Sequence, residues 1–300
     1  MIKKPLVSIV MLSWNRKEDV RQSLLQIMNQ EYQPIEIILV DNCSTDGTID
    51  MVRRLFPSVI IIEMKKNMGI AAYNFGFEAA KGEYILILDD DSFPAPNAVI
   101  YMVEKFEKDR QLGMVAFDVR NVESYDQVAK TDNVEKFPSA VIGASGYYMS
   151  FNGAGAGVRK SVFKEVGYYP GEFFLYNNEQ DVAFRIWNSG YKIVFYPDCV
   201  SYHKYSPTNR TSWRAPFYYT RNAFWVIWKN YPLDLAIIGT IRMIFKSIYY
   251  SLEQRTPIYI NAMITAFAGI GSLKGKRKAV KREIAQNLRF PLDTNFTFYR

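Results

Sequence analysis

The sequence predicts an α/β fold in which a mostly parallel sheet is flanked by helices, and three observations lead to this prediction. Over the first 118 residues, short apolar runs such as Ile35–Val40 alternate with amphipathic helical segments. The segments between the runs are long enough to be helical crossovers between parallel strands. Polar clusters follow three of the runs, at 13–15, 41–44 and 89–91. The carboxyl ends of parallel strands meet at one edge of a sheet, so ligand binding is expected there.

Each expected element follows from a local pattern. Strands are expected where β-branched and aliphatic residues run together, at 7–12, 35–40, 59–62, 84–88, 114–117 and 192–196. Helices are expected where apolar residues recur at helical spacing, at 16–28, 49–56, 70–81, 99–106, 161–166 and 178–188. Asn15 is expected to cap the first helix, with Glu18 completing a capping box, and Asn67–Gly69 to open the third. The stretch 119–152 is expected to be rich in loops.

The composition excludes several classes of protein. Hydrophobic residues make up 49% of the 300-residue chain and charged residues 22%, which is enough apolar material for a core and excludes intrinsic disorder. Two cysteines, Cys43 and Cys199, exclude a disulfide framework and a cysteine-only zinc site, and they favour a reducing compartment. The first apolar run passes directly into polar residues at 13–16 with no small-residue cleavage site, so a strand is expected there rather than a signal peptide.

The charge is distributed unevenly along the chain. Residues 201–300 hold 16 Lys or Arg against 4 Asp or Glu, whereas residues 1–200 hold 21 against 26. Such a basic segment is either a solvated face or a surface that attracts nucleic acid, phospholipid headgroups or a phosphate-bearing substrate. The segment also contains aromatic residues from about 213 onward, followed by apolar, helical stretches at 235–250 and 258–273. These helices suit either a membrane interface or ordinary packing on the main domain.

Two features of the sequence suggest a metal site. Asp89-Asp90-Asp91 follows a buried strand, and carboxylates at a strand end are hard oxygen ligands for Mg²⁺ or Mn²⁺, although a solvated acidic turn has the same pattern. His203 is the single histidine of the chain and is expected just beyond the strand at 192–196. It is either an ordinary polar residue or a further ligand, because imidazole suits Mn²⁺ and similar metals.

Two further segments bear on catalysis. Glu179 lies in the first turn of an expected helix, where acids usually stabilise the helix dipole, but a glutamate facing a cleft can also act as a general base. The glycine-rich run Gly153–Gly157 lacks the Gly-Lys-Ser/Thr ending of a P-loop. The first strand–helix turn has no glycine, which argues against a dinucleotide-binding site. Gly153 and Gly155 therefore suggest a close approach of the backbone to a substrate.

These motifs, taken in order, resemble a known family. The segments are VSIVMLSWNR, IEIILVDNCSTDGT, NMGIAAYNFGFEAAKGEYILILDDDS and the stretch from GAGAGVRKSVF to VSYH. Over roughly residues 5–205 the chain resembles glycosyltransferase family 2, and within it the rhamnosyltransferase-like branch that builds bacterial polysaccharides. YYTRNAFWVIWKNYP resembles the Tyr-x-x-Arg-Asn stretch that often follows in this branch. The resemblance implies a GT-A fold with a C-terminal helical extension.

The resemblance also implies roles for individual residues. The catalytic base is expected to be Glu179. Positions that match the metal ligands, expected to bind Mn²⁺ or Mg²⁺ through a D-x-D motif, are Asp89, Asp91 and His203. Positions expected to bind the nucleotide are Ser13, Asn15, Asp41, Asn67, Gly69 and Asp90. Positions expected near the acceptor or the donor sugar are Gly153, Gly155, Asp181 and Arg185, of which the last two are expected to orient the helix and Glu179.

The family implies a domain division and an activity. Residues 1–210 are expected to form the catalytic domain, with a nucleotide-sugar-binding half at 1–118, an acceptor and catalytic half at 119–210, and a basic, aromatic helical extension at 211–300. The expected activity is inverting, metal-dependent transfer of a sugar from dTDP-rhamnose or a UDP-sugar to a hydroxyl of a glycan or lipid-linked glycan. A sugar-1-phosphate nucleotidyltransferase would require glycines in the first loop, which SWNRKEDV lacks.

Two departures from the family pattern leave an alternative open. Asn178-Glu179 stands where the family usually has Glu-Asp, and Tyr73 stands where an arginine usually precedes Asn74. These departures support a catalytically degenerate member as the alternative, and the basic, aromatic segment supports a nucleic-acid- or lipid-binding protein as another. Nucleic acid is not expected as a partner, because no nucleic-acid-binding motif accompanies the basic segment.

The basic segment predicts a location. Six cations next to the apolar stretch 258–273 suit an anionic membrane surface, and they are Lys274, Lys276, Arg277, Lys278, Lys281 and Arg282. The enzyme is therefore expected to be cytoplasmic and peripheral at the inner face of the cell membrane.

Overall fold

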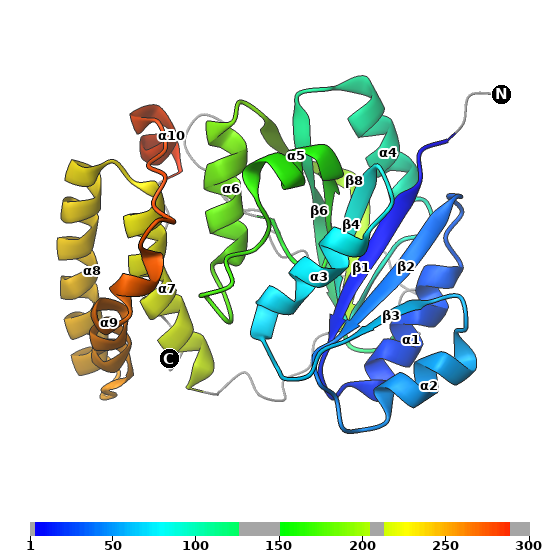
Figure 1. Cartoon of the computed structure of the whole chain (residues 1–300), viewed down its shortest axis with the longest axis horizontal. Coiled ribbons are helices and arrows are strands. Elements are labelled where there is room, and N and C mark those ends of the chain that lie inside the picture. The colour runs from blue at the N-terminus through cyan, green and yellow to red at the C-terminus, as the bar shows by residue number, and fades with distance from the viewer. Residues whose placement is uncertain (1–3, 126–150, 205–212, 289–300) are drawn as a thin grey trace.

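An eight-stranded sheet lies between two layers of helices in the computed structural model of the chain, which describes residues 4–125, 151–204 and 213–288 (Figure 1). The strands are β1 Val7–Ser13, β2 Ile35–Asp41, β3 Ile60–Glu63, β4 Tyr84–Asp89, β5 Ser92–Pro94, β6 Leu112–Val122, β7 Ala156–Arg159 and β8 Lys192–Lys204. Their order across the sheet is β3-β2-β1-β4-β7-β6-β8-β5, with β7 and β5 antiparallel to their neighbours. The predicted fold class, a mostly parallel sheet flanked by helices, is confirmed.

The register of the central strands aligns their carboxyl ends. β1 pairs in parallel with β2 on one side and β4 on the other, so Ser13 lies beside Asp41 and Leu12 beside Asp89. Loops that leave these three strands therefore start from the same edge of the sheet, where ligands of open α/β sheets bind.

The helices cover both faces of the sheet. One face is covered by α1 Lys17–Met28, α2 Thr48–Leu55 and α4 Ala98–Lys108. The other is covered by α3 Tyr73–Ala79, α5 Lys160–Val166 and α6 Asn178–Asn188. Along β1, Ile9 and Met11 contribute to the first core and Val10 to the second, as the two-residue alternation of a strand requires. Each fully buried aliphatic side chain contributes about 1.5–3 kcal/mol relative to exposure.

The C-terminal helices pack beside α6 and not on the sheet (Figure 1). They are α7 Arg214–Asn230, α8 Leu233–Glu253, α9 Ile258–Ala268, a 3₁₀ turn at Ile270–Leu273 and α10 Arg282–Asn287. A third apolar core joins them to the main domain, because Phe173 and Phe184 are fully buried among Phe224, Trp225 and their neighbours. The helical extension is thus continuous with the α6 side of the domain.

Two expected helix starts are wrong. α1 begins at Lys17, not at an Asn15 cap, and Asn15 adopts a left-handed backbone conformation with φ of 54°. The first helical amide is instead capped from the neighbouring loop, where Asp46 Oδ2 accepts from the Lys17 N–H at 2.9 Å. Asn67–Gly69 does not open an α-helix either, because Gly69–Ala72 is a 3₁₀ turn and α3 starts only at Tyr73.

Two strands also differ from expectation. The glycine-rich run leads into β7, which the sequence did not predict as a strand. β8 continues well past Tyr196, because a bulge accommodates residues 197–199: Phe117 of β6 pairs with Tyr196 and the next residue, Asp118, pairs with Val200. His203 therefore lies within β8. Part of the loop-rich stretch expected at 119–152 is the end of β6, and residues 126–150 lie outside the described part of the chain.

Candidate active site

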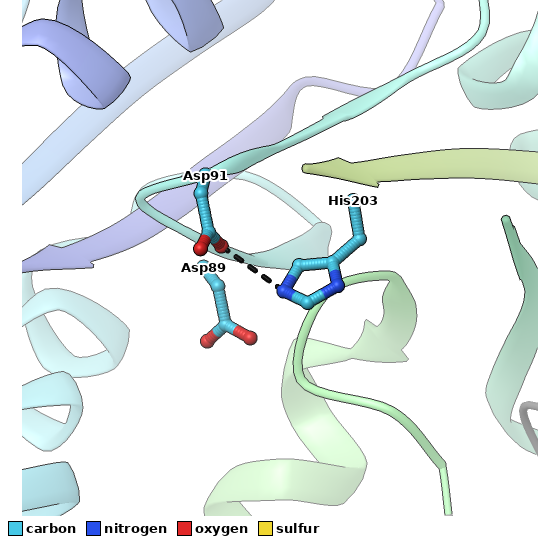
Figure 2. A group of neighbouring side chains, drawn as sticks. All are labelled: Asp89, Asp91 and His203. Carbon is cyan, nitrogen blue, oxygen red and sulfur yellow. Dashed lines mark ion pairs between the residues drawn. The ribbon is translucent and has the colours of Figure 1, made fainter. Parts of the chain in front are cut away.

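Three predicted metal ligands converge at the carboxyl edge of the sheet (Figure 2). Asp89 ends β4, Asp91 lies in the turn to β5, and His203 lies on β8. β5 brings them together, because it pairs antiparallel with β8 and places Ser92 opposite His203. One potential ligand atom from each residue lies within 4.8 Å of the others, and His203 Nε2 is 3.2 Å from Asp91 Oδ1. Two carboxylates and an imidazole form a donor set that fits Mn²⁺ or a similar divalent cation.

The orientation of the His203 ring is fixed from behind. Its Nδ1 lies 2.9 Å from Oδ1 of Asn121, the residue opposite it on β6. A carbonyl oxygen only accepts, so with this amide orientation Nδ1 carries a hydrogen, and Nε2, which faces Asp91 Oδ1, would bind a cation through its lone pair once it has lost its own proton. Metal-binding histidines are commonly held this way by a second hydrogen bond. Asn121 was not predicted, and its position is visible only from the β6–β8 register.

The acids of this group are unequally neutralised. Burial raises the pKa of Asp89 above its ordinary value, and the nearby charge of Asp91 raises it further. Burial also disfavours ionised Asp91, but His203 and Arg16 outweigh it and hold the pKa of Asp91 below its ordinary value. The Arg16 guanidinium forms an ion pair with Asp91 and lies 3.8 Å from Asp90 Oδ1. Arg16 follows β1 in the motif SWNR, and no pattern in the sequence predicted a role for it.

Asp90 points away from the metal ligands. Its Oδ2 accepts a long hydrogen bond of 3.4 Å from the Trp14 backbone N–H, so it faces the loop after β1. Burial raises the pKa of Asp90 well above its ordinary value. This position, beside the first loop, is compatible with its predicted place in the nucleotide site.

Two predicted nucleotide-binding residues have buried polar atoms without partners. Among the described residues, Ser13 Oγ and Asp41 Oδ1 make no hydrogen bond, although both residues are fully buried. Asp41 Oδ2, in contrast, accepts from the Ser44 N–H at 2.8 Å. A buried polar group left unpaired costs about 1–3 kcal/mol, so atoms of this kind at a ligand-binding edge indicate where a ligand supplies the missing bonds.

The other predicted nucleotide contacts join the loops beside these two residues. Asn67 Oδ1 accepts from the Gly69 N–H at 2.8 Å and from Asn42 Nδ2 at 3.0 Å. Asn42 thereby ties the loop after β3 to the end of β2. Asn15 spans two loops, since its Oδ1 accepts from the Thr45 N–H at 2.7 Å. Asn42 was missed, although an Asn directly after a strand in VDNCST is itself a signal for such a bridge.

Glu179, the predicted base, faces the same space as Asp89. A Cβ placed on Gly153 would lie 3.5 Å from Asp89 Oδ1 and 3.6 Å from Glu179 Oε1, so the missing side chain leaves open the volume between the two carboxylates. Burial raises the pKa of Glu179 to about 7, and the charge of Asp89 adds to this effect. A carboxylate with a pKa near neutrality suits proton abstraction. Gly153 thus lies beside both carboxylates.

Three residues predicted near the sugars are placed differently. A Cβ on Gly155 would lie 2.7 Å from the Ser201 side chain, so close packing against β8 explains this glycine. Asp181 is fully buried and pairs with Arg185 at 3.0 Å, on the side of α6 that faces α7. Arg185 also donates to the backbone carbonyl of Tyr168 at 2.7 Å. Asp181 and Arg185 therefore anchor α6, which agrees with the orienting role that the sequence favoured and not with sugar contact.

Tyr73, which replaces the arginine usual in the family, also contacts the acidic group. Its hydroxyl lies 2.7 Å from the Leu88 carbonyl oxygen and 3.1 Å from Asp89 Oδ1. The ring is buried and stacks on Phe77. Tyr73 therefore orients the Asp89 carboxylate through a hydrogen bond, but it does not place a positive charge beside it as an arginine would.

Solved structures with this architecture are GT-A glycosyltransferases. The chain superposes on the mannosyltransferase PcManGT from Pyrobaculum calidifontis, solved with GDP-Man and Mn²⁺, with a TM-score of 0.58 and 20% identity over 91% of this chain and 76% of that one. It superposes on S. aureus TarS 1–349 in complex with UDP-GlcNAc with a TM-score of 0.62 and 18% identity over 87% and 81%. At these identities the similarity shows the fold.

Sequence relatives lead to the family. The profile of "Glycosyl transferase family 2" matches residues 8–177, more than half of the chain. The probable glycosyltransferase YdaM of Bacillus subtilis (strain 168) is 25% identical over 83% of this chain. The poly-beta-1,6-N-acetyl-D-glucosamine synthase of Staphylococcus aureus (strain COL) is 24% identical over 64% of it. The chain spans 62% and 48% of these two relatives.

The chain belongs to glycosyltransferase family 2. The profile match includes the predicted nucleotide contacts, the D-x-D motif and Gly153, but it ends before Glu179 and His203. The candidate roles of Glu179 and His203 therefore rest on their positions in the structure and not on the family match.

Proposed function

We propose that this chain transfers a sugar, with inversion, from a nucleotide-diphosphate sugar to a hydroxyl of a glycan or lipid-linked glycan. The donor is dTDP-rhamnose or a UDP-sugar, and transfer depends on Mn²⁺ or Mg²⁺ held by Asp89, Asp91 and His203. One observation supports this proposal above the others. The group of Asp89, Asp91 and His203, which could hold a cation, and the Glu179 carboxylate, whose pKa is raised, face the same open volume above Gly153. This volume lies at the sheet edge where Ser13 and Asp41 have unpaired buried atoms.

The protein's own residues account for the steps. Ser13 and Asp41 bind the nucleotide, and Asn67 and Gly69 form the wall beside it. The divalent cation, when bound, neutralises charge on the leaving diphosphate. Glu179 takes the proton of the acceptor hydroxyl, whose oxygen forms the new bond to the anomeric carbon while the bond to the diphosphate breaks. Attack from the side opposite the diphosphate inverts the anomeric centre.

The choice of donor divides between two groups of nucleotide sugars. dTDP-rhamnose follows from the resemblance to the rhamnosyltransferase-like branch. A UDP-sugar is supported by TarS, solved with UDP-GlcNAc, whereas PcManGT was solved with GDP-Man. A panel of dTDP-, UDP- and GDP-sugars therefore covers the plausible donors.

The proposed function is tested by metal-dependent turnover of this panel, measured as release of the nucleoside diphosphate. We expect turnover of one donor with Mn²⁺ or Mg²⁺, and loss of it in EDTA and in Asp91→Ala. Full activity of Asp91→Ala, or in EDTA, would overturn the metal assignment. If the protein neither turns over nor binds any donor of the panel, this result would favour the alternative of a degenerate family member.

The extension supports a second part of the proposal, attachment to a membrane. Three of the six predicted cations bind within the protein: Lys276 pairs with Glu172, Arg282 with Asp234, and Arg277 donates to the backbone carbonyl of Tyr231. Lys274, Lys278 and Lys281 are exposed. The electrostatic anchor is therefore weaker than six free cations would be.

An apolar surface on α8 compensates for this. α8 is long and apolar enough, by length and composition alone, to cross a membrane, but 33% of its most apolar window is buried inside the protein. Its other side is exposed, with Phe245 and Leu252 68% and 73% accessible. The α8 apolar face comprises Leu233, Ile237, Ile238, Ile241, Phe245, Ile248, Tyr249 and Leu252. A patch of this kind on a soluble domain marks an interaction surface.

We propose that an anionic lipid surface, at the cytoplasmic side of the cell membrane, covers this face. Charge complementarity favours lipid over a second copy, because two copies would bring their basic extensions together. The test is flotation with neutral and anionic vesicles at low and high salt. We expect anionic vesicles to bind, with part of the binding retained at high salt and lost in Phe245→Asp/Leu252→Asp. Leu55→Asp, at an exposed leucine of α2, is the matched control. Equal binding by both variants would overturn the proposal.

A further inference from the structure

The loop that leads into α6 has an unusual backbone. Phe174, Tyr176 and Asn177 all adopt left-handed conformations, with φ of 64°, 65° and 62°. Residues other than glycine seldom do so, and each such position costs on the order of 1–3 kcal/mol. A conformation of this kind persists only where surrounding contacts hold it.

α7 supplies those contacts from a sequence separation of more than forty residues. Asn222 Nδ2 lies within hydrogen-bond distance of three loop carbonyls, those of Phe173 at 3.1 Å, Leu175 at 2.6 Å and Tyr176 at 2.9 Å. Asn222 is fully buried. The two hydrogens of this one amide group thus serve three carbonyls of the loop, including that of the strained residue Tyr176.

Arg221 completes the arrangement. Its Nε and Nη2 donate to Asn222 Oδ1 at 3.0 and 2.9 Å, which orients the Asn222 amide with its donor toward the loop. Nη2 also donates to the Phe173 carbonyl at 2.6 Å. The guanidinium also stacks on Trp225, 4.3 Å from the ring centroid. Hydrogen bonds and stacking together therefore fix its position.

The loop connects the two halves of the proposed site. At one end the Phe174 carbonyl accepts from the Ile70 N–H at 2.8 Å, beside Gly69, where a Cβ would lie only 2.0 Å from that oxygen. At the other end Asn177 precedes α6 by one residue, and Glu179 lies in its first turn. The position of Glu179 relative to the nucleotide wall therefore depends on the loop conformation.

We propose that Arg221 and Asn222 are positioning residues that hold loop 173–177 so that Glu179 faces Asp89 across Gly153. The inference rests on the proposed role of Glu179 as base. It assigns a function to the Arg-Asn pair of YYTRNAFW, which lies in the extension and outside the family match. A misplacement of about 1 Å at a reacting group can reduce turnover about 10²-fold, so a loop-holding residue affects turnover without touching substrate.

The test compares variants of α7 for turnover, donor affinity and stability. Asn222→Asp keeps the shape but replaces the donor with an acceptor, and Arg221→Lys keeps the charge but loses the fork that orients Asn222. Thr220→Val is the matched control, because Thr220 is equally buried in the same helix and its hydroxyl bonds only within it, to the Pro216 carbonyl at 2.7 Å. Glu179→Gln tests the proposed base separately.

We expect Asn222→Asp to lower kcat about 10²-fold and Arg221→Lys about tenfold, with the Kd for the metal–nucleoside diphosphate within about twofold of that of Thr220→Val. If Asn222→Asp does not fold, Arg221→Lys decides. Provided that Glu179→Gln is inactive, two results would overturn the inference. One is a kcat of the α7 variants equal to that of Thr220→Val, and the other is a loss of turnover that a weaker Kd or a larger unfolded fraction fully explains. Full activity of Glu179→Gln would instead overturn the proposed base, whatever the α7 variants show.

Discussion

Two regions of the molecule bury carboxylates, and they treat them in opposite ways. At the sheet edge, Asp89 has a raised pKa and lies within ligand distance of Asp91 and His203. At the contact between α6 and α7, Asp181 lies 3.0 Å from Arg185 and 3.1 Å from Lys229, and its pKa is held below its ordinary value although burial alone would raise it. At Asp89 burial outweighs the nearby cations Arg16 and His203, whereas at Asp181 the cations Arg185 and Lys229 outweigh burial.

The contact between α6 and α7 is an extended ion network. Lys229 Nζ also lies 3.0 Å from Glu172 Oε1, and Glu172 pairs in turn with Lys276 from the basic segment. Lys229 and Lys276 hold the pKa of Glu172 below its ordinary value despite burial. Removing one partner of such a network leaves an uncompensated buried charge, so the network joins the extension to the domain.

The difference separates two acids that their spacing in the helix alone could not separate. Glu179 and Asp181 are two residues apart, so they project from different sides of α6. Burial raises the pKa of Glu179 to about 7, while the matched cations lower that of Asp181. Acids whose environments shift their pKa values in opposite directions have different roles: Glu179 suits proton transfer and Asp181 suits structure.

The largest effect is expected at the proposed base. Glu179→Gln keeps the shape but cannot accept a proton, so turnover should fall by about 10²-fold or more while donor affinity is unchanged. The variant should gain thermal stability over wild type as pH rises from 4.5 to about 7, because in this window the unfolded carboxyl is ionised and the folded one resists ionisation. Steady-state kinetics and melting curves measure both, and an active Glu179→Gln with an inactive Asp181→Asn would reverse the two roles.

The complementary change tests the ion network. Asp181→Asn leaves Arg185 without its buried counter-charge and Lys229 with Glu172 alone, and the free energy of unfolding at pH 7 should fall by about 3 kcal/mol. A carboxyl with a lowered pKa stabilises the fold above its unfolded pKa, so the difference from wild type should shrink below about pH 3.8. Urea unfolding at two pH values measures it, and an unchanged midpoint at pH 7 would show that the network contributes no stability.

A pH profile sharpens the assignment of the base. If Glu179 acts deprotonated, kcat should reach a plateau above a pKa of about 7 and fall about tenfold per pH unit well below it. Asp181, with a lowered pKa, should add no step in this range. A profile that stays flat down to pH 5 would contradict the raised pKa of the base.

A smaller effect is expected from filling the open volume. Gly153→Ala should remain close to wild type, because its Cβ would lie no nearer than 3.5 Å to Asp89. Gly153→Leu should lower kcat about tenfold, since its longer side chain projects between Asp89 and Glu179. Gly171→Leu is the matched control, because Gly171 is exposed and its Cβ would meet only the Ala71 Cβ, at 4.0 Å. Equal activity of both leucine variants would place the reaction elsewhere.

The meeting of Ser13, Asp41 and Asp89 at one edge could be predicted because it depends on local patterns. Ser13, Asp41 and Asp89 each end a parallel strand, and strand ends meet at one edge whatever the details of packing. The loops themselves were less predictable: Asn15 resembles a helix cap in sequence, but Asp46 from another loop takes that role. A single-sequence pattern cannot show which of two neighbouring loops supplies a cap.

The remaining residues depend on long-range contacts. Pro197 and Asp198 resemble a strand end, and only the bulge against β6 explains how β8 continues to His203. Arg16 and Asn222 act through residues about 75 and 47 positions away, a separation at which sequence periodicity carries no information. Buried charged and polar groups need partners, so residues such as Arg16 and Asn222 are expected to exist, but this rule does not identify them.

The central claim is that the sheet edge, and not the contact between α6 and α7, binds a divalent cation together with a nucleoside diphosphate. Calorimetric titration of Mn²⁺ into the protein with saturating UDP or dTDP tests it directly, in wild type, Asp89→Asn and Asp181→Asn. We expect one Mn²⁺ per chain in wild type and in folded Asp181→Asn, and none in Asp89→Asn. Undiminished Mn²⁺ binding by Asp89→Asn would contradict the account.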